Sequence, residues 1–328
     1  MEVIIMFESM IAALKQHNRK IVFTEGTDPR ILEAASRLHK EGILSPILIG
    51  DPKEIENAAK QSGWSIDGIE IIDPLHYNEI EEMIAKMVEL RKGKMDESAC
   101  RTALSKSNYF GTMLVKMKKA DCLLGGATYS TADTVRPALQ LIKTKPENKI
   151  VSSCFILSRQ TEGKTELYAM ADCAINLDPT EDELVEIACE TARTARTFSI
   201  DPNVALLSYS TLGSGKGETV DKVNHAASKL KALHLDFPVD GELQFDAAFS
   251  QTVAKTKAPD STVAGKANVF VFPDINAGNI GYKIAQRLGG FEAFGPILQG
   301  LQAPINDLSR GCNADEVYKM SIITAALI

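Results

Sequence analysis

Residues 304–316 hold the group of side chains in this chain that is best suited to chemistry. They read Pro-Ile-Asn-Asp-Leu-Ser-Arg-Gly-Cys-Asn-Ala-Asp-Glu and bring a hydroxyl, a guanidinium and two adjacent carboxylates close together, on Ser309, Arg310, Asp315 and Glu316. The first half of the stretch is polar and turn-forming, whereas apolar residues recur about once per helical turn after it. The pattern predicts a loop that leads into a helix.

Helix capping explains part of this stretch. Asn313 is a favoured N-cap residue, and Glu316 three places later completes a sequence close to a capping box. Asp315 and Glu316 also suit the positive end of a helix dipole. Capping does not require the Ser309–Arg310 pair one turn ahead of it, so this pair is the stronger candidate for chemistry.

The composition is that of a globular protein. The chain has 328 residues, of which 45% are hydrophobic, 24% charged and 6% aromatic. This length allows a large core and about two domains. The net charge of -7 and the pI near 5.4 disfavour binding to nucleic acid, which requires a basic face. Any anionic ligand must therefore be held by locally placed cations and backbone N–H groups.

The sequence predicts neither a secretion signal nor a membrane span. Glu2 and Glu8 flank the short apolar run near the start, no cleavage site follows it, and no apolar run approaches the ~18 residues of a span. The six cysteines form no C-x-x-C pair, which argues against a zinc knuckle and favours reduced thiols. We expect a cytoplasmic protein without a metal site.

Strands and helices alternate through the first part of the chain, which is typical of βαβ units and a parallel sheet. Strands are predicted at 20–25, 46–50, 69–73 and 120–125, and helices at 6–16, 29–40, 52–61, 77–91, 97–119 and from about 131 to 143. The polar segment 143–149 reads as a connection between domains.

The second part begins with shorter, antiparallel-looking pieces and then returns to alternation. A hairpin-like unit is predicted at 150–157, 167–171 and 174–177, followed by helices at 179–198, 220–233 and 280–288 and strands at 204–209, 241–249 and 269–272. The sequence therefore predicts a second α/β unit.

Three strand-to-helix junctions are candidate anion sites, because ligands of open α/β sheets bind at the carboxyl ends of strands. The glycine-rich loop 210–217 lacks two residues of the nucleotide-binding template, so a ligand contact and a simple tight turn are equally supported. Lys283 and Arg287, four residues apart after the loop that begins at Asp274, share one helical face. The loop 125–131 precedes Arg136 in the same way. The five histidines lie outside these junctions, and we interpret them as structural.

Five segments carry a resemblance to a known family. They are Ser-Thr-Ala-Asp-Thr-Val-Arg-Pro (130–137), Phe-Pro-Asp-Ile-Asn-Ala-Gly-Asn-Ile-Gly-Tyr-Lys (272–283), Gln-Arg-Leu-Gly-Gly (286–290), Gly-Pro-Ile-Leu-Gln-Gly-Leu (295–301) and Pro-Ile-Asn-Asp-Leu-Ser-Arg-Gly-Cys (304–312). These segments resemble the phosphate acetyltransferases, or phosphotransacetylases, in their short single-module form. The likeness extends over essentially the whole chain, and it implies interconversion of acetyl-CoA and phosphate with coenzyme A and acetyl phosphate.

The resemblance also implies an architecture. It predicts two α/β domains that flank a cleft, related to the isocitrate and isopropylmalate dehydrogenase fold, usually in a homodimer. Domain I would comprise residues 1–145 and 301–328, and domain II residues 146–300. Coenzyme A would be a substrate, and no tightly bound cofactor, nucleic acid or membrane would be a partner.

The resemblance assigns catalytic roles to residues of the 304–316 stretch. A free thiol has a pKa of about 8.5, so a base beside the sulfur of coenzyme A would raise the reactive fraction at neutral pH. The family places this base seven residues after the motif serine, which is Glu316 here. The family has Glu then Asp where this chain has Asp315 then Glu316, so Asp315 remains an alternative base. Ser309 would hydrogen-bond the sulfur or the developing oxyanion, Arg310 would hold acetyl phosphate, and Cys312 has no covalent role.

The resemblance assigns substrate binding to a further group of residues. Arg287 and Arg136 would bind substrate phosphates, and Arg91 a phosphate of coenzyme A, because a guanidinium meets phosphate with two parallel hydrogen bonds. Ser130, Thr131, Asn279 and Lys283 are the other residues expected to bind substrate.

Three other functions are compatible with parts of this pattern. The chain could prefer butyryl or propionyl groups, since the acyl pocket is not readable from sequence. It could be a non-catalytic module that senses acetyl-CoA, although the intact Ser309–Arg310 pair argues against this. A dehydrogenase of the related fold is the third option, but the sequence has nothing like the aspartate cluster that binds metal in those enzymes.

Overall fold

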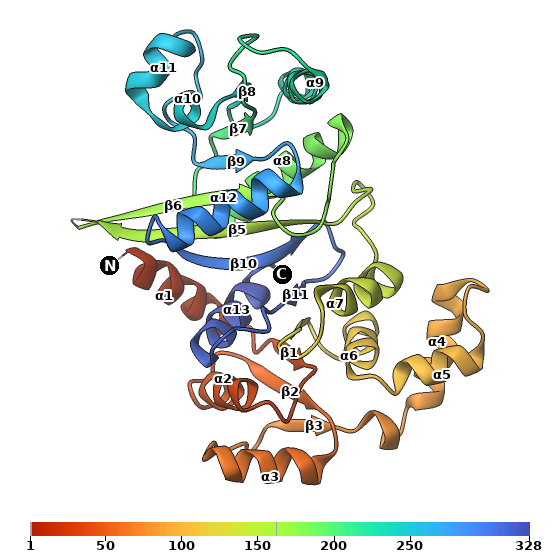
Figure 1. The fold of residues 1–328 in the computed structure, drawn as a ribbon. Helices are drawn as coiled ribbons and strands as arrows, with labels where there is room; N and C mark the ends of the chain where they lie inside the picture. The colour runs from red at the N-terminus through yellow and green to blue at the C-terminus, as the bar shows by residue number, and fades with distance from the viewer. Residues whose placement is uncertain (1, 162) are drawn as a thin grey trace. The chain divides into compact units, whose positions relative to one another are not determined.

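The chain folds into two compact units. The computed structural model describes residues 2–161 and 163–328, with side chains from residue 7 onward. Residues 7–145 and 301–328 form one unit, here called the N/C unit. Residues 146–300 form the other, here called the middle unit, to which residues 2–6 also belong. Figure 1 shows that each unit contains its own sheet with helices packed on it. The predicted α/β class is confirmed.

The N/C unit is built on a five-stranded parallel sheet with the strand order β11-β4-β1-β2-β3. Its strands are β1 (Lys20–Phe23), β2 (Ser45–Ile49), β3 (Glu70–Ile72), β4 (Cys122–Gly125) and β11 (Ile305–Asp307). Its helical segments are the part of α1 (Glu2–Leu14) from residue 7 onward, α2 (Pro29–Lys40), α3 (Pro52–Ser62), the 3₁₀ turn η1 (Pro74–His76), α4 (Ile80–Arg91), α5 (Glu97–Leu104), α6 (Ser107–Lys116), α7 (Thr131–Pro137), the π-helical η2 (Ala138–Ile142) and α13 (Ala314–Ala326).

Helices cover both faces of this sheet. Figure 1 shows α2 and α13 together on one side and α6 on the other. The strands between them are continuous runs of buried apolar residues, as in β1, where Ile21, Val22 and Phe23 are fully buried. Runs of this kind are characteristic of parallel strands covered on both faces.

The middle unit contains a mixed six-stranded sheet with the order β10-β5-β6-β9-β7-β8. Its strands are β5 (Ser152–Thr161), β6 (Lys164–Ala171), β7 (Val204–Leu207), β8 (Val239–Leu243), β9 (Val269–Val271) and β10 (Glu292–Gln299). Its helices are α8 (Glu181–Thr197), α9 (Glu218–Ala232), α10 (Phe245–Phe249), α11 (Gln251–Lys257) and α12 (Ile275–Arg287). The predicted hairpin is the antiparallel pair β5 and β6, along which α12 lies (Figure 1).

The strand predicted at 174–177 is wrong. Residues 173–176 form a turn around the buried carboxylate of Asp172, which accepts hydrogen bonds from the backbone N–H groups of Ala174, Ile175 and Asn176 at 3.0–3.2 Å. A side chain that satisfies successive N–H groups removes the donors that a strand needs.

Two helix predictions also need correction. The helix predicted at 97–119 is two helices, α5 and α6, and the Ser105 hydroxyl at the end of α5 donates to the carbonyl of Thr102 at 2.8 Å. The helix predicted at 280–288 begins earlier, because Asp274 caps it by accepting from the N–H groups of Asn276 and Ala277.

Three strands also differ from the prediction. The predicted strand at 241–249 is β8 followed by α10, and β10 and β11 were not predicted.

A candidate active site at the carboxyl edge of the parallel sheet

Three loops of the N/C unit leave the same edge of its sheet. The strands β11, β4 and β1 are neighbours, and their register pairs Asp307 with Gly125 and Leu124 with Phe23. The strands are parallel, so the loops 24–28, 126–130 and 308–313 all begin at this edge. This is where ligands of parallel sheets bind.

The loop 308–313 presents Ser309 and Arg310 to solvent. The N–H group of Leu308 donates to the carbonyl of Gly125 at 2.7 Å, which ties the start of the loop to the neighbouring loop. Within the loop, the N–H of Cys312 donates to the carbonyl of Ser309 at 2.9 Å. Both Ser309 and Arg310 are exposed. Among the described residues, the Arg310 guanidinium has no hydrogen-bond or ion-pair partner, so it is available to an anion.

Asn313 and Glu316 form the predicted capping box at the start of α13. The Asn313 side chain accepts from the Glu316 N–H at 2.9 Å, and the Glu316 carboxylate accepts from the Asn313 N–H at 3.3 Å. Asp315 instead pairs with Arg37 of α2 at 2.6 Å. The hydrogen bond and the charge of Arg37 lower the pKa of Asp315. The two adjacent carboxylates therefore have different surroundings: the ionised Asp315 is paired with Arg37, whereas Glu316 is exposed and, among the described residues, accepts a hydrogen bond only from a backbone N–H.

Cys312 is a buried residue of this loop. Burial raises the pKa of its thiol to about 11. A thiol with this pKa carries almost no thiolate at neutral pH, which fits the expectation that Cys312 forms no covalent intermediate.

Two carboxylates, on the partly buried Glu25 and the buried Asp307, hold the loop 126–130 and the start of α7, and neither was singled out from the sequence. Glu25 accepts from the N–H groups of Gly126 at 2.9 Å and Thr128 at 3.2 Å. Asp307 accepts from the hydroxyl groups of Thr131 at 2.6 Å and Thr134 at 2.5 Å. Burial raises the pKa of both carboxyl groups, against the effect of these hydrogen bonds. Buried carboxylates that accept several hydrogen bonds make a rigid support for the loop.

Replacing Gly126 with alanine is expected to destabilise this support. Gly126 has a φ of +99°, and an added Cβ would lie 2.2 Å from Oδ1 of Asp307. Gly63 is a matched control, since it has a φ of +76° but nothing within 4 Å of the added atom. Gly63→Ala should lower the free energy of unfolding by roughly 1–2 kcal/mol, the strain of a left-handed residue. Gly126→Ala should lower it by about 1.5–3 kcal/mol more, the range for a lost hydrogen bond to a charged group. Urea unfolding measures both, and equal losses would contradict the packing argument.

Ser130, Thr131 and Arg136 lie at the start of α7. Ser130 is the N-cap residue, but its hydroxyl donates to the Asp133 carboxylate at 2.7 Å and makes no cap bond to the backbone. The hydroxyl proton of Thr131 is directed to Asp307. Arg136 is exposed, and its nearest carboxylate is Asp133 at 3.8 Å. The guanidinium of Arg136 is thus only weakly paired.

Arg91 and Arg136 lie close to one tyrosine, Tyr109 of α6. Burial raises the pKa of Tyr109, and the charges of Arg136 and Arg91 oppose that rise. Gln140 connects the group, because it accepts from the Tyr109 hydroxyl at 3.0 Å and, through its carbonyl, from Arg91 at 3.5 Å. Nε of Arg91 is buried and has no partner among the described residues. The sequence carried no signal for Tyr109 and Gln140.

The middle unit holds the other predicted binding residues on a single helix. Asn279, Lys283 and Arg287 follow one another at intervals of four along α12, so they lie on one face. The Asn279 amide donates to the carbonyl of Cys173 at 2.9 Å and accepts from Lys283 at 2.8 Å. Arg287 is exposed, and no hydrogen bond or ion pair joins its side chain to another described residue.

The glycine-rich loop 210–217 is satisfied by the protein itself. The carboxylate of Glu242, which is fully buried, accepts from the N–H of Gly213 at 2.7 Å, the hydroxyl of Ser210 at 2.9 Å and the amide of Asn224 at 2.9 Å. The N–H of Gly215 donates to the Ser210 hydroxyl at 2.8 Å. Donors engaged in this way do not form an anion cradle, and the structure favours the simple tight turn.

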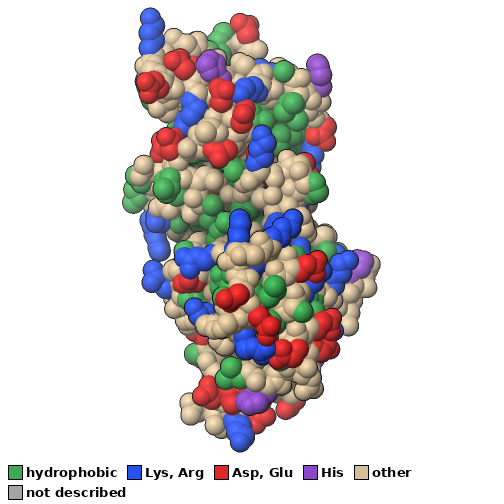
Figure 2. Space-filling model, turned by 90° about the vertical axis from the view of Figure 1, so that its right-hand side faces the viewer, with side chains coloured by type: hydrophobic (Ala, Val, Ile, Leu, Met, Phe, Trp, Pro, Cys, Tyr) green, Lys and Arg blue, Asp and Glu red, His purple; other side chains and the backbone are tan. Residues whose placement is uncertain are grey.

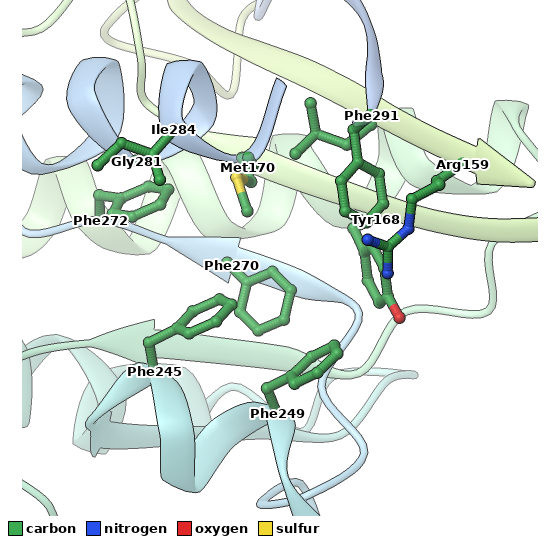
Figure 3. Close-up of a pocket in the computed structure, with 12 residues that line it drawn as sticks. Arg159, Tyr168, Met170, Phe245, Phe249, Phe270, Phe272, Gly281, Ile284 and Phe291 are labelled. Atoms are coloured by element: carbon green, nitrogen blue, oxygen red, sulfur yellow. The ribbon is translucent and has the colours of Figure 1, made fainter. Parts of the chain in front are cut away.

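An apolar cavity of about 470 Å³ lies in the middle unit. Figure 3 shows Phe245 and Phe249 of α10 below Phe270 of β9, with Tyr168 and Phe291 at one end of the cavity. The charged side chain in its lining, Arg159, is paired with Glu166 at 2.7 Å and donates to the carbonyl of Gly289. This lining has no group suited to phosphate or thiol chemistry.

The surface charges agree with a locally built anion site. On the face presented in Figure 2, acidic and basic side chains are interspersed.

Across the part of the chain that the structure describes, no three His, Cys, Asp or Glu side chains are grouped to hold a metal ion. Within residues 2–161 and 163–328, no helix has both the length and the apolar character needed to cross a membrane.

The sequence and the fold both match known proteins over nearly the whole chain. The profile of the phosphate acetyl/butaryl transferase family matches residues 5–325. Phosphate acetyltransferase from Bacillus subtilis (strain 168) is 55% identical over 307 residues, which are 94% of this chain and 94% of that protein. The protein of the same name from Staphylococcus aureus (strain Mu50) is 48% identical over 317 residues, 95% of each chain.

Solved structures give the same result. A phosphotransacetylase from Streptococcus pyogenes matches with a TM-score of 0.96 and 52% identity over 100% of this chain and 99% of the other. EutD phosphotransacetylase from Staphylococcus aureus matches with a TM-score of 0.91 and 46% identity over 99% and 98%. With a sheet edge that presents Ser309 and Arg310 and with these similarities along its length, the chain belongs to the phosphate acetyl/butaryl transferase family.

Proposed function

We propose that this protein is a phosphate acetyltransferase that interconverts acetyl-CoA and phosphate with coenzyme A and acetyl phosphate. The observation that carries the proposal is the exposed Ser309–Arg310 pair, whose guanidinium has no partner among the described residues, at the carboxyl edge of the parallel sheet. An unpaired guanidinium beside a hydroxyl suits an acyl phosphate, which offers phosphate oxygens and a carbonyl. Proteins of this name are among the relatives that match nearly all of the chain.

The proposed chemistry is direct acyl transfer in a ternary complex. In the direction of acetyl-CoA synthesis, the sulfur of coenzyme A attacks the carbonyl carbon of acetyl phosphate. The C–S bond forms, the bond between the carbonyl carbon and the phosphate oxygen breaks, and inorganic phosphate leaves. The thiol proton passes to a protein base and then to solvent or phosphate. Coenzyme A is consumed as a substrate, so no resident cofactor is needed.

Glu316 is the proposed base, with Asp315 as the alternative. The ion pair with Arg37 makes Asp315 the weaker acceptor, because accepting a proton would break that pair. Glu316 is exposed and faces no cation in this way. The Ser309 hydroxyl is proposed to donate to the sulfur or to the oxyanion that develops on the carbonyl, and Arg310 to bind the phosphate group.

The remaining arginines are proposed to bind the charged ends of the substrates. The charges of Arg91 and Arg136 both act on Tyr109, and two cations placed in this way would suit the phosphates of coenzyme A. Ser130 and Thr131 stand beside Arg136 at the same helix start. Asn279, Lys283 and Arg287 are proposed to contribute to substrate binding from the middle unit.

A coupled assay tests the proposal directly. Purified protein is mixed with acetyl-CoA, and thiol release is followed with and without inorganic phosphate. We expect thiol release that depends on phosphate and yields acetyl phosphate. Phosphate-independent release, or none, would contradict the proposal. A series of acetyl-, propionyl- and butyryl-CoA distinguishes acetyl transfer from transfer of longer acyl groups, and we expect the highest kcat/KM with acetyl-CoA.

We also propose a homodimer. Ile280 and Ile284 of α12 and Leu288 directly after it form an exposed apolar row, and Leu288 is 85% exposed. Large exposed apolar rows are typical of interfaces. The wild-type protein is expected to have a molar mass in light scattering of twice the 35.6 kDa of one chain. Leu288→Glu is expected to reduce this mass to that of a monomer. Leu177→Glu, at a residue that is 72% exposed in the same unit, is the control and should stay dimeric. A wild-type monomer would exclude the dimer.

A cytoplasmic location is proposed from the thiols. All six cysteines are free, and five of them are buried, as expected in a reducing compartment. Fractionation of the source cells tests this: the acetyltransferase activity should appear in the soluble cytoplasmic fraction, and activity in the secreted or membrane fraction would contradict it.

A further inference from the structure

One guanidinium, that of Arg30 at the start of α2, joins the three loops of the candidate site. Its Nε and Nη2 donate to the two carboxylate oxygens of Asp28 at 2.9 and 2.7 Å. Nη2 also donates to the carbonyl of Ala127 at 2.9 Å. Nη1 donates to the carbonyls of Arg310 at 2.9 Å and Cys312 at 3.1 Å. An arginine side chain has five N–H donors, and each of them has an acceptor here.

These bonds are placed where they can fix the reactive loop. The two carbonyls on the loop 308–313 flank Gly311, next to Ser309 and the Arg310 side chain. Among the described residues, the hydrogen bonds that leave residues 309–312 for other parts of the chain are those with Arg30. The remaining bonds of this segment are internal to the loop. The Leu308–Gly125 bond holds the start of the loop, and Arg30 holds the part that follows Ser309, so the position of Ser309 relative to the loop 126–130 depends on both.

We propose that Arg30, oriented by Asp28, is a positioning residue that holds Ser309 and Arg310 in place for acyl transfer; this inference rests on the proposed function. Arg30 itself does not bind substrate, because no N–H group of its guanidinium is free. The carboxylate of Asp28 balances the charge of the Arg30 guanidinium and fixes its orientation through two hydrogen bonds. Burial would raise the pKa of Asp28, but the hydrogen bonds and the charge of Arg30 outweigh it, so the pKa is lowered and the carboxylate stays ionised at neutral pH.

Lysine cannot replace Arg30 in this arrangement. A lysine ammonium has three donors on a single nitrogen, whereas the acceptors of Arg30 belong to three separate loops around a planar fork. Arg30→Lys keeps the charge and most of the apolar stem but should release the loop 308–313. Arg101→Lys is the control, because Arg101 also pairs with a carboxylate through two bonds of 2.7 Å, to Glu81, but on the solvent-exposed surface of α5.

The first test is kinetic. Arg30→Lys is expected to lower kcat by tenfold or more, toward the ~10²-fold loss that a displacement of about 1 Å can produce, with a KM for coenzyme A within about threefold of wild type. Arg101→Lys should retain wild-type kcat. In Arg30→Ala, guanidinium ion at concentrations far below those that unfold proteins should restore part of kcat, and equal concentrations of potassium chloride should not. A kcat within twofold of wild type in Arg30→Lys would overturn the inference.

The second test does not depend on activity. Hydrogen–deuterium exchange of the amides of residues 308–313 should be about tenfold faster in Arg30→Lys than in wild type and in Arg101→Lys, because the loop opens locally. Asp28→Asn should also speed the exchange of these amides, but to a smaller degree. This variant keeps Arg30, so it tests the inference even if an Arg30 variant folds poorly. Unchanged exchange in both variants would overturn the inference. An inactive wild-type protein would instead contradict the proposed function, and the exchange result would still decide whether Arg30 holds the loop.

Discussion

Glu316→Gln is expected to lower kcat by about 10²–10⁴-fold, the contribution of general acid–base catalysis. Glutamine has the same shape as glutamate but cannot accept a proton from the thiol of coenzyme A. It can still accept the hydrogen bond from the N–H of Asn313 at the start of α13, so the helix cap is retained. The loss should therefore appear in kcat, with little change in thermal unfolding. Steady-state kinetics in the direction of acetyl-CoA synthesis measures it.

Asp315→Asn provides the comparison for this variant. It removes the neighbouring carboxylate, which pairs with Arg37 at 2.6 Å on the surface. Exposed pairs of this kind contribute about 0–1 kcal/mol to stability, so the variant should fold and stay within a few-fold of wild-type kcat. The opposite result, an inactive Asp315→Asn with an active Glu316→Gln, would transfer the base role to Asp315. Raising the pH should partly restore Glu316→Gln, because the thiol then ionises without a base.

Arg310→Gln is expected to reduce kcat/KM for acetyl phosphate by about 10²–10³-fold, comparable to the loss of one donor that stabilises the transition state. The Arg310 side chain has no partner among the described residues, while its carbonyl is held by Arg30 through the backbone. The substitution therefore removes the cation and leaves the loop anchored. Initial rates over a range of acetyl phosphate concentrations measure the effect, and KM for coenzyme A should change little.

Two further variants define what Arg310 contributes. Arg310→Lys keeps the charge but loses the planar fork, so its activity should lie between those of the wild type and Arg310→Gln. Arg101→Gln removes an arginine that is paired with Glu81 and Glu97 on the surface, and it should leave kcat/KM unchanged. Arg310→Gln with wild-type kcat/KM for acetyl phosphate would contradict the assigned role.

The sequence predicted the regular parts of the fold because local patterns determine them. The helix α2 follows from Asp28 as its cap and Pro29 at its first position, and the structure has both. The strand β11 was not predicted, because Asn306 and Asp307 read as a polar loop. Both residues are buried, with partners far along the chain: Thr324 for Asn306, and Thr131 and Thr134 for Asp307. A sequence pattern contains no information on such distant partners.

The early start of α12 was missed for a related reason. Gly278 reads as a loop residue, yet it lies inside the helix. An added Cβ there would come within 2.2 Å of the carbonyl of Asp172, so the glycine serves close packing between the helix and a turn. β10 contains a cis Gly295–Pro296 bond and an irregular register between Phe294 and Ile297, and it lacks the alternation by which a strand is recognised.

In the candidate site too, some residues could be predicted from the local sequence and others could not. Ser309 and Arg310 became candidates because they are adjacent and helix capping left them unexplained, and Glu316 became one because the family resemblance places the base at that position. Glu25, Arg30 and Asp307 were not found, because their roles depend on three loops that meet only after the sheet has formed. Asp28 caps α2 as its local sequence favours, but its pairing with Arg30 depends on the fold and gives it a second role.

The position of β11 at the edge of the parallel sheet has a consequence for synthesis of the protein. β11 pairs with β4, whose residues precede it by slightly more than half of the chain, and the middle unit lies between them in the sequence. The loop with Ser309 and Arg310 can join its partner loops only after residues 301–328 have left the ribosome and β11 has paired. Closing so long a span is slow compared with local folding. Until β11 has paired with β4, the chain therefore lacks the arrangement that brings Ser309 and Arg310 to the loops 24–28 and 126–130.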